Sequence, residues 1–249
     1  MQQERIVGGK PALLIEGERK FLVITDLHIG FENALAANEI FIGKNTTVKE
    51  TIEELSKIIE IEKPDSVILL GDIKSSIKNI SKTEWVDVPL FFEKIKEKCN
   101  LILIPGNHDA NIARLVPEGI SMISSTGMVE ENILFTHGHR MPSENFSHIK
   151  KIIMGHVHPV FFQEDSIVNG QRVWISIKTN KENIFPSESG EIEITIVPSF
   201  NKYFYATNKR KYKKSISPII EKIKQVSKAR IVTLDGAIIG DETVLDQVL

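Results

Sequence analysis

Five short apolar runs occupy this 249-residue chain, and polar side chains that can bind metal ions directly follow each of them. The runs lie at residues 21–24, 67–70, 101–104, 133–135 and 152–154, and the segments after them read TDLH, GDIK, PGNHD, THGH and GHVH. Short runs rich in Ile, Val and Leu are typical of buried strands. Because strand ends meet at one edge in open α/β sheets, the polar residues between 26 and 158 are expected to converge.

The segments between these runs predict the fold class. Apolar residues at helical spacing over 47–64 predict an amphipathic helix that ends at Pro64, and residues 86–98 predict a second helix. Beyond about residue 120, strands joined by short turns predict a second, mostly antiparallel sheet. We therefore expect an α/β fold of two packed mixed β-sheets flanked by helices. No Pro/Gly/Ser-rich linker interrupts the chain, which favours a single domain over residues 1–249.

The donor atoms in the five polar segments favour a catalytic metal centre. Six of the seven histidines lie there, together with carboxylates and one amide, and there is no thiolate. This set suits Mn, with Fe, Zn or Ni as alternatives, better than it suits structural zinc. The candidate ligands are Asp26, His28, Asp72, Asn107, His137, His156 and His158.

Spacing and charge indicate how such a centre would work. Asp26 and His28, like His156 and His158, are two residues apart, so each pair lies on the same side of an extended chain. A shared carboxylate would hold two ions ~3.5–4 Å apart, as in-line attack at phosphorus requires. Two divalent ions carry more charge than the carboxylates and a hydroxide neutralise, which favours an anionic phosphate. A histidine that is not committed to metal could protonate the leaving oxygen.

The order D-x-H, GD, GNHD, HGH and GH-x-H resembles that of the calcineurin-like metallophosphoesterase superfamily. The resemblance implies a two-sheet sandwich flanked by helices. It also implies that His108 is the general acid, oriented by Asp109, with His139 near the metals but not bound to them, and His148 outside the site. The ligand sets that it implies are Asp26, His28, Asp72 and His158 for one ion, and Asp72, Asn107, His137 and His156 for the other.

A narrower resemblance is carried by DLHIGFENAL, LLGDIK, VPSF, ISP and the closing LDGAIIG. These sequences are similar to those of small archaeal and bacterial phosphoesterases related to the exonuclease of double-strand-break repair, which implies a role in DNA repair. One departure is the sequence Lys74-Ser75-Ser76, where that branch would offer a histidine after the lysine. The sequence leaves open whether the protein forms a homodimer or pairs with a helicase-like or ATPase partner.

Charge is segregated along the chain, and this bears on the substrate. The net charge is -2, yet residues 202–230 contain ten Lys or Arg and one Glu, which leaves -11 for the remainder. Within the basic segment at 200–230, aromatic and basic residues alternate, a mixture suited to phosphate contact and base stacking. The alternative is a solvated, lysine-rich surface loop. The candidate contacts are Tyr205, Lys209, Arg210, Lys211, Tyr212, Lys213 and Lys214.

The cellular compartment can also be predicted. The single cysteine, Cys99, excludes an internal disulfide, and we find neither a ~20-residue apolar span nor a secretory signal, so a cytoplasmic protein that is not embedded in a membrane is expected.

The leading hypothesis is a two-metal phosphodiesterase that cleaves nucleic acid. The alternatives are hydrolysis of a small phosphoester, such as a cyclic nucleotide or a phosphomonoester, and a non-catalytic scaffold. An HD-type hydrolase is disfavoured because His108-Asp109 follows a strand pattern rather than a helix.

Overall fold

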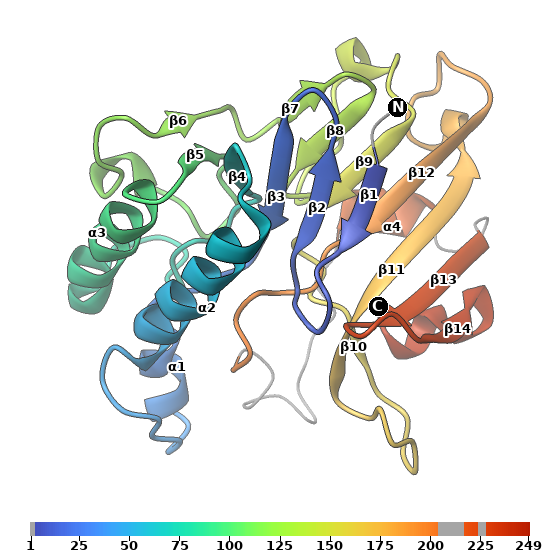
Figure 1. Ribbon diagram of the computed structural model, residues 1–249. Helices are drawn as coiled ribbons and strands as arrows, with labels where there is room; N and C mark the ends of the chain where they lie inside the picture. The colour runs from blue at the N-terminus through green and yellow to red at the C-terminus, as the bar shows by residue number, and fades with distance from the viewer. Residues whose placement is uncertain (1–2, 204–216, 224–227) are drawn as a thin grey trace.

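The computed structural model describes residues 3–203, 217–223 and 228–249. Within these ranges two mixed β-sheets pack face to face, with α1, α2 and α3 beside the first sheet and α4 beside the second (Figure 1). The helices are α1 (Glu32–Ala36), α2 (Thr46–Glu62), α3 (Lys82–Lys96) and α4 (Pro218–Ile223), and the 3₁₀ turns are η1 (Ile112–Arg114), η2 (Glu144–Phe146), η3 (Lys181–Asn183) and η4 (Glu242–Gln247). The predicted α/β sandwich is confirmed.

The first sheet has the order β1-β2-β3-β4-β5-β6 among the described residues. Strands β3, β4, β5 and β6 run parallel, and the hairpin of β1 and β2 adds two antiparallel strands at one edge. The crossovers between the parallel strands contain α2 and α3. The strands are β1 (Gln3–Ile6), β2 (Leu13–Glu16), β3 (Lys20–Ile24), β4 (Ser66–Leu69), β5 (Asn100–Leu103) and β6 (Ser121–Met122).

The second sheet has the order β14-β13-β11-β12-β9-β8-β7, with β10 paired to β11. Most of its pairings are antiparallel, as predicted, but β8, β9 and β12 lie parallel to one another. The strands are β7 (Met128–Glu130), β8 (Ile133–Thr136), β9 (Lys151–Met154), β10 (Val160–Phe161), β11 (Gln171–Asn180), β12 (Glu191–Ile196), β13 (Lys228–Thr233) and β14 (Ile238–Asp241).

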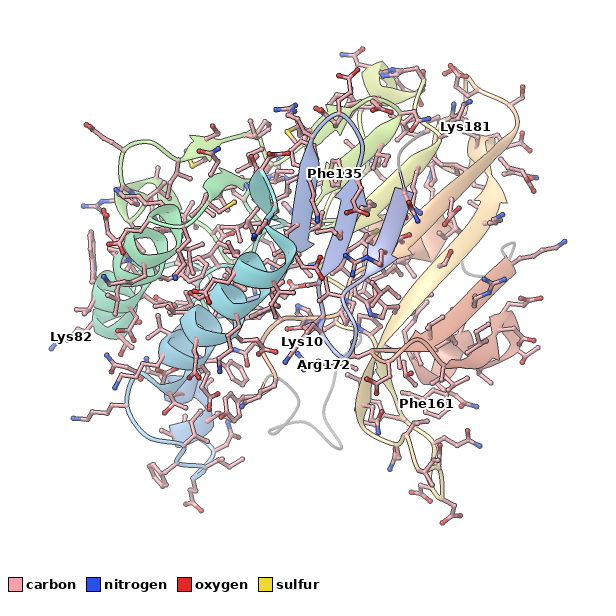
Figure 2. All side chains as sticks on the ribbon, in the orientation of Figure 1. Lys10, Lys82, Phe135, Phe161, Arg172 and Lys181 are labelled. Atoms are coloured by element: carbon pink, nitrogen blue, oxygen red, sulfur yellow. The ribbon has the colours of Figure 1, made fainter. Side chains whose placement is uncertain are left out.

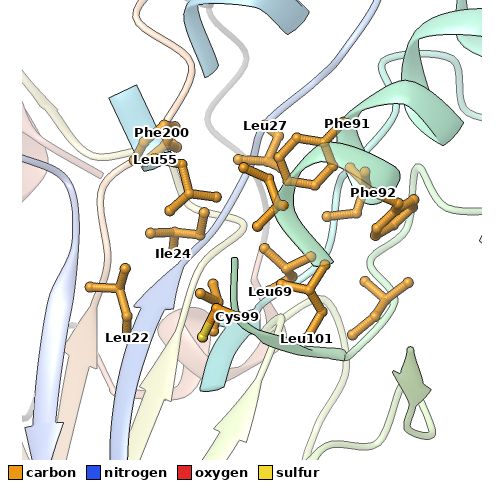
Figure 3. Close-up of a cluster of buried hydrophobic side chains, with 14 of the residues drawn as sticks. Leu22, Ile24, Leu27, Leu55, Leu69, Phe91, Phe92, Cys99, Leu101 and Phe200 are labelled. Carbon is orange, nitrogen blue, oxygen red and sulfur yellow. The ribbon is translucent and has the colours of Figure 1, made fainter. Parts of the chain in front are cut away.

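Alternating side chains along the strands build separate apolar layers. In β3, Leu22 and Ile24 face the helices, whereas Phe21 and Val23 face the second sheet. Figure 3 shows part of the helix-side layer, in which Leu22 and Ile24 lie with Phe91 of α3. This two-residue period is what a strand covered on both faces requires. The layer between the sheets fixes their mutual position, and with it the strand ends that carry the polar residues.

The two predicted crossover helices are present, but one begins earlier than expected. Helix α2 ends at Glu62, just before Pro64, as the sequence predicted. Helix α3 begins at Lys82 rather than near 86, because Ser81 caps it: the Ser81 hydroxyl accepts from the Glu84 amide, and the Glu84 carboxylate accepts from the Ser81 amide. Across the described residues, no helix is long and apolar enough to cross a membrane.

Candidate metal centre

The five predicted strand ends converge, but they belong to both sheets. Strands β3, β4 and β5 of the first sheet precede Asp26, Asp72 and Asn107, whereas β8 and β9 of the second sheet precede His137 and His156. The expectation of a single sheet edge is therefore replaced by a seam between two sheets. The residues on either side of this seam come within coordinating distance of each other only because the sheets pack face to face.

Two groups of side chains could each hold a metal ion. The first contains Asp26, His28, Asp72 and His158, and the second contains Asp72, His137 and His156. In each group, one donor atom from every residue lies within 4.8 Å of the others. Asp72 belongs to both groups, which is the position that a bridging carboxylate requires.

Individual distances support this grouping. His158 Nε2 lies 2.9 Å from Asp26 Oδ1, and 3.3 Å separates His28 Nε2 from His158 Nε2. In the second group, His137 Nε2 lies 3.4 Å from Asp72 Oδ1. Asn107 belongs there too, because its Oδ1 lies 3.1 Å from His137 Nε2.

The Asp72 carboxylate provides a test of whether these residues fit metal ions. Its Oδ2 is buried and has no hydrogen-bond partner among the described residues. The Nε2 atoms of His28 and His108 both lie 3.9 Å from this oxygen, too far for a hydrogen bond. A buried carboxylate oxygen left in this state is costly, whereas a cation held between it and the imidazoles would satisfy it. The donor set therefore fits divalent ions.

Burial and opposite charge shift the pKa values of the group. Burial alone would raise the pKa of Asp26 and of Asp72, but neighbouring imidazoles outweigh it and lower both values. Burial lowers the pKa of His28 and of His156 to about 3, so both rings are neutral and have a lone pair for a metal. For His137, burial is outweighed by Asp72 and Asp26, which raise its pKa to about 9. The two carboxylates thus favour the charged form of the His137 ring.

A hydrogen bond to a backbone carbonyl orients two of the histidines. His137 Nδ1 donates to the Leu70 carbonyl at 2.6 Å, which leaves Nε2 facing Asp72 and Asn107. His108 Nδ1 lies 2.5 Å from the Ser75 carbonyl and donates to it, because a carbonyl only accepts. His108 Nε2 consequently faces the Asp72 carboxylate, and its side chain remains 20% exposed. With Nδ1 donating to Ser75, it is the doubly protonated, charged ring that can give a proton from Nε2 to a substrate.

Asp109 holds a different position from the one expected. Its carboxylate oxygens accept from the backbone amides of Gly106 at 2.8 Å and Ile73 at 2.9 Å, and Ser75 rather than Asp109 holds the His108 ring. Asp109 therefore ties the GNHD turn to the GD turn and acts on His108 through the backbone. Burial and the nearby Asp72 charge raise the pKa of Asp109 to about 6.

The turns that present the ligands have an uncommon backbone conformation. Asp26, His28, Asp72, His156 and His158 all have positive φ, with values of 56, 44, 51, 70 and 49°. Such residues cost about 1–3 kcal/mol each and persist where their surroundings hold them, most often at functional sites. Clustering of this strain at the predicted ligands is independent support for a site here.

The turns of the two sheets also pack very closely against each other at the centre. A side chain at Gly106 would collide with the Asp72 carboxylate and the His137 ring. A side chain at Gly155 would collide with the Thr25 hydroxyl. These glycines let the ligand turns approach one another, and any larger residue would displace the ligands.

The other two histidines were predicted to lie near the metals, in the case of His139, and outside the site, in the case of His148. The His139 ring lies 5.3 Å from the His137 ring, centroid to centroid, and burial together with His137 lowers its pKa to about 4. His139 thus borders the centre without belonging to either ligand group. His148 is exposed and lies before β9.

Two buried residues that were not predicted as site residues support this centre. Lys74 is fully buried, and its Nζ donates to the Ser76, Ile77 and Asn79 carbonyls. Glu84 accepts from the amides of Ser76 and Ser81. Together they hold the loop that presents the Ser75 carbonyl to His108. The signals available were the lysine after GD and the Ser-x-x-Glu capping box at 81–84.

The predicted nucleic-acid contacts cannot be placed. Tyr205, Lys209, Arg210, Lys211, Tyr212, Lys213 and Lys214 lie outside the residues that the structure describes. The part of the basic segment that is described includes Lys202, whose Nζ lies 3.0 Å from the Glu50 carboxylate.

Comparisons with known proteins identify the family. Residues 19–174, more than half of the chain, match the family model of the calcineurin-like phosphoesterases, whereas no curated protein matches the sequence. Among solved structures, the nuclease MPE of Pseudomonas putida has a TM-score of 0.53 at 16% identity, covering 94% of this chain and 98% of that chain. Yfce, a phosphoesterase from E. coli, has a TM-score of 0.41 at 14% identity, covering 89% and 97%.

The structural likeness to the Pseudomonas nuclease shows the fold, and the family match covers β3 to the start of β11, including every predicted ligand. The resemblance seen in the ordered motifs is confirmed. This chain belongs to the calcineurin-like phosphoesterase family and is a metal-dependent phosphoester hydrolase.

Proposed function

We propose that the protein is a two-metal phosphodiesterase that cleaves nucleic acid. The observation that carries this proposal is the basic and aromatic segment at 202–230, which has ten Lys or Arg and one Glu in an otherwise acidic chain that contains a phosphoesterase site. Basic residues interleaved with aromatic ones suit a polyanion with stacking bases. Similarity to the Pseudomonas putida nuclease over nearly the whole length of both chains also supports it.

The residues of the centre divide the chemistry between them. In the proposal, Asp26, His28, Asp72 and His158 hold one ion, and Asp72, Asn107, His137 and His156 hold the other. Two bound ions would activate water and neutralise charge on the phosphoryl group. His108 donates a proton from Nε2 to the leaving oxygen, while the Ser75 carbonyl keeps the proton on Nδ1 and stabilises the ring when it is charged.

Access to the centre fits this division of roles. The carboxylates of Asp26 and Asp72 and the rings of His28 and His137 are fully or almost fully buried, whereas His108 and His156 are partly exposed. A substrate approaching from solvent therefore meets His108 before it meets the carboxylates. The leaving oxygen is the part of the substrate that needs this proton donor.

A panel of substrates tests the proposal. Turnover of bis-p-nitrophenyl phosphate, p-nitrophenyl phosphate and labelled DNA and RNA oligonucleotides is measured with Mn, Mg, Zn and Ni. We expect Mn-supported cleavage of oligonucleotides and of the diester. A preference for the monoester by orders of magnitude would favour the small-phosphoester alternative, which the -11 charge outside residues 202–230 supports.

A charge-neutralised variant tests the role of the basic segment. Replacing Lys209, Arg210, Lys211, Lys213 and Lys214 by Gln should weaken oligonucleotide binding and flatten its salt dependence, by about 0.7 in log–log slope for each single-strand phosphate that the variant no longer neutralises. Turnover of the small diester should stay the same. The matched control replaces five exposed lysines of the α2 and α3 region, Lys57, Lys63, Lys94, Lys96 and Lys98, by Gln. Equal loss of binding in both variants would refute a dedicated nucleic-acid segment.

A further inference from the structure

The segment after β12 crosses from the second sheet to the first. Phe200 belongs to the helix-side core of the first sheet, and Figure 3 shows it beside Leu55 of α2. Its neighbours Ser199 and Asn201 are polar yet buried, with exposed fractions of 0% and 4%. Buried polar side chains of this kind need partners, and these two find them at the predicted metal ligands.

Residues 199–201 donate hydrogen bonds to four successive carbonyls of the Asp26 turn. The Phe200 amide donates to Thr25 at 2.9 Å, and the Ser199 hydroxyl donates to Asp26 at 2.9 Å. The Asn201 side-chain amide donates to Leu27 at 2.9 Å and, more weakly, to His28 at 3.4 Å. These hydrogen bonds all go to the backbone of the turn.

The other face of the same turn is bound by the GD turn. The Asp26 amide donates to Gly71 at 3.1 Å, and the His28 amide donates to Asp72 at 2.9 Å. The Asp26 turn is therefore held from both sides while Asp26 and His28 stay in the left-handed region. Non-glycine residues stay there only when several interactions over-determine the backbone, and the 199–201 segment supplies those on one side of the turn.

Arg172 at the start of β11 fixes the segment in turn. Its Nη1 donates to the Ser199 carbonyl at 2.7 Å and to the Phe200 carbonyl at 3.0 Å. Arg172 also lines a groove with Lys10, and both side chains are labelled in Figure 2. A chain of hydrogen bonds thus runs from the second sheet, through Arg172 and residues 199–201, to the Asp26 turn of the first sheet.

We propose that Ser199, Asn201 and Arg172 are positioning residues for one of the two metal ions. Two of the four ligands predicted for the first ion, Asp26 and His28, lie in the turn that the segment holds. The second ion draws on Asp72, Asn107, His137 and His156, and the segment makes none of its described hydrogen bonds to their turns. Removing the segment's hydrogen bonds should therefore lower the affinity for the first ion more than the affinity for the second. The inference depends on the two-ion assignment and not on the identity of the substrate.

Metal binding, measured separately from activity, tests the inference. The full-length protein is stripped with EDTA and titrated with Mn²⁺, and free ion and the coupled signal of a Mn pair are followed by electron paramagnetic resonance. In Asn201→Leu, the Leu27 and His28 carbonyls lose their side-chain donor. We expect the affinity for one ion to fall ~10- to 100-fold, as for other residues that orient ligands, and the affinity for the second to change less than ~2-fold.

Reference variants identify which ion is affected. His28→Asn should lower the affinity for the first ion, and His137→Asn should lower the affinity for the second. The titration of Asn201→Leu should therefore match that of His28→Asn. Thr179→Val is the control for general destabilisation. Thr179 is as buried as Asn201, and its hydroxyl accepts from Asn183 Nδ2 at 2.9 Å. It lies near the end of β11 opposite to Arg172. This variant should lower the melting temperature and leave both affinities unchanged.

Ser199→Ala keeps the test decisive if Asn201→Leu does not fold, because it removes a single hydroxyl. It should weaken the same ion, to a smaller extent. The inference is overturned if the folded variants keep both Mn²⁺ affinities within ~2-fold of the parent, or if the affinities for both ions fall equally. A parent protein that binds fewer than two ions would instead refute the two-ion assignment itself.

Discussion

His108 shows how a backbone carbonyl can orient a side chain. Its Nδ1 is bound to the Ser75 carbonyl, its backbone amide donates to Asp72 Oδ1 at 2.8 Å, and its Nε2 faces the centre. The residue is therefore tied both to the proposed bridging carboxylate and to the loop after it. A proton donor in this position matters most when the leaving oxygen is a poor leaving group.

Replacing His108 by Ala should lower kcat about 10²- to 10⁴-fold on alkyl phosphodiesters, and much less on p-nitrophenyl esters, because p-nitrophenolate leaves without protonation. Metal content should not change. Steady-state kinetics and metal analysis check this, with His148→Ala, at an exposed histidine, as the control. An unchanged rate on alkyl diesters would contradict the general-acid role.

At this scale the sequence predicted the residues better than their contacts. The side chains predicted as ligands all lie at the centre. They could be predicted because their residue types and their order are visible in the sequence. The partner of His108 was expected to be Asp109, yet it is the carbonyl of Ser75. A backbone carbonyl has no sequence signature, since every residue has one. Ser199 and Asn201 were missed for a related reason: they bind backbone atoms of a turn more than 170 positions away.

Helix α3 and the loop before it form the element that presents Ser75 to His108. The Glu84 carboxylate joins the two, because one oxygen accepts from Ser81 at the helix start and the other from Ser76 in the loop. The buried Lys74 ammonium closes the same loop from the opposite end. The stability of a helix terminus is in this way linked to the orientation of the proton donor.

Replacing Glu84 by Ala should lower the free energy of unfolding by about 2–4 kcal/mol, because it removes the capping box and leaves the partly buried amides of Ser76 and Ser81 without their acceptor. Denaturant titration measures this. We also expect kcat on alkyl diesters to fall while Mn²⁺ affinity stays close to that of the parent. Glu93→Ala, at an exposed position of the same helix, is the control and should change stability by less than about 0.5 kcal/mol. A similar effect of both variants would argue against the link.

The elements themselves were mostly predictable. The period of 3.6 over α2 and the buried runs of β3, β4, β5, β8 and β9 are strong local signals. The start of α3 was missed because four polar or aromatic residues at its N-terminus hide the apolar period that begins later, while the capping box was the better guide. Which strands share a sheet was not predictable, because local patterning does not identify partners.

At the scale of the molecule, the centre lies across the two sheets. The first sheet supplies Asp26, His28, Asp72 and Asn107, and the second supplies His137, His156 and His158. Ions bound by both sets would add a connection between the two sheets to the apolar layer that packs between them. Binding should therefore stabilise the whole fold, and chelation should weaken it.

Saturating Mn²⁺, at about 100 times its dissociation constant, should stabilise the folded protein by about 2.7 kcal/mol for each ion. For a chain of this size that corresponds to a rise in melting temperature of roughly 5–10 °C per ion. Differential scanning calorimetry with and without EDTA measures it. Asp72→Asn, which weakens the proposed bridge, should lose most of the increase. An unchanged melting temperature in the parent protein would contradict binding across the sheets.

The left-handed backbone of the ligand turns has a further consequence, for the choice of ion. Turns held by backbone hydrogen bonds on several sides cannot open to admit a larger cation. Calcium needs 6–8 oxygen donors at about 2.3–2.6 Å in a pliant cage, and magnesium retains its waters and avoids imidazole. We therefore expect a stiff pocket that offers each proposed ion two imidazole nitrogens to bind calcium and magnesium poorly and to prefer transition metals, which competition titrations with Ca²⁺, Mg²⁺ and Mn²⁺ would check.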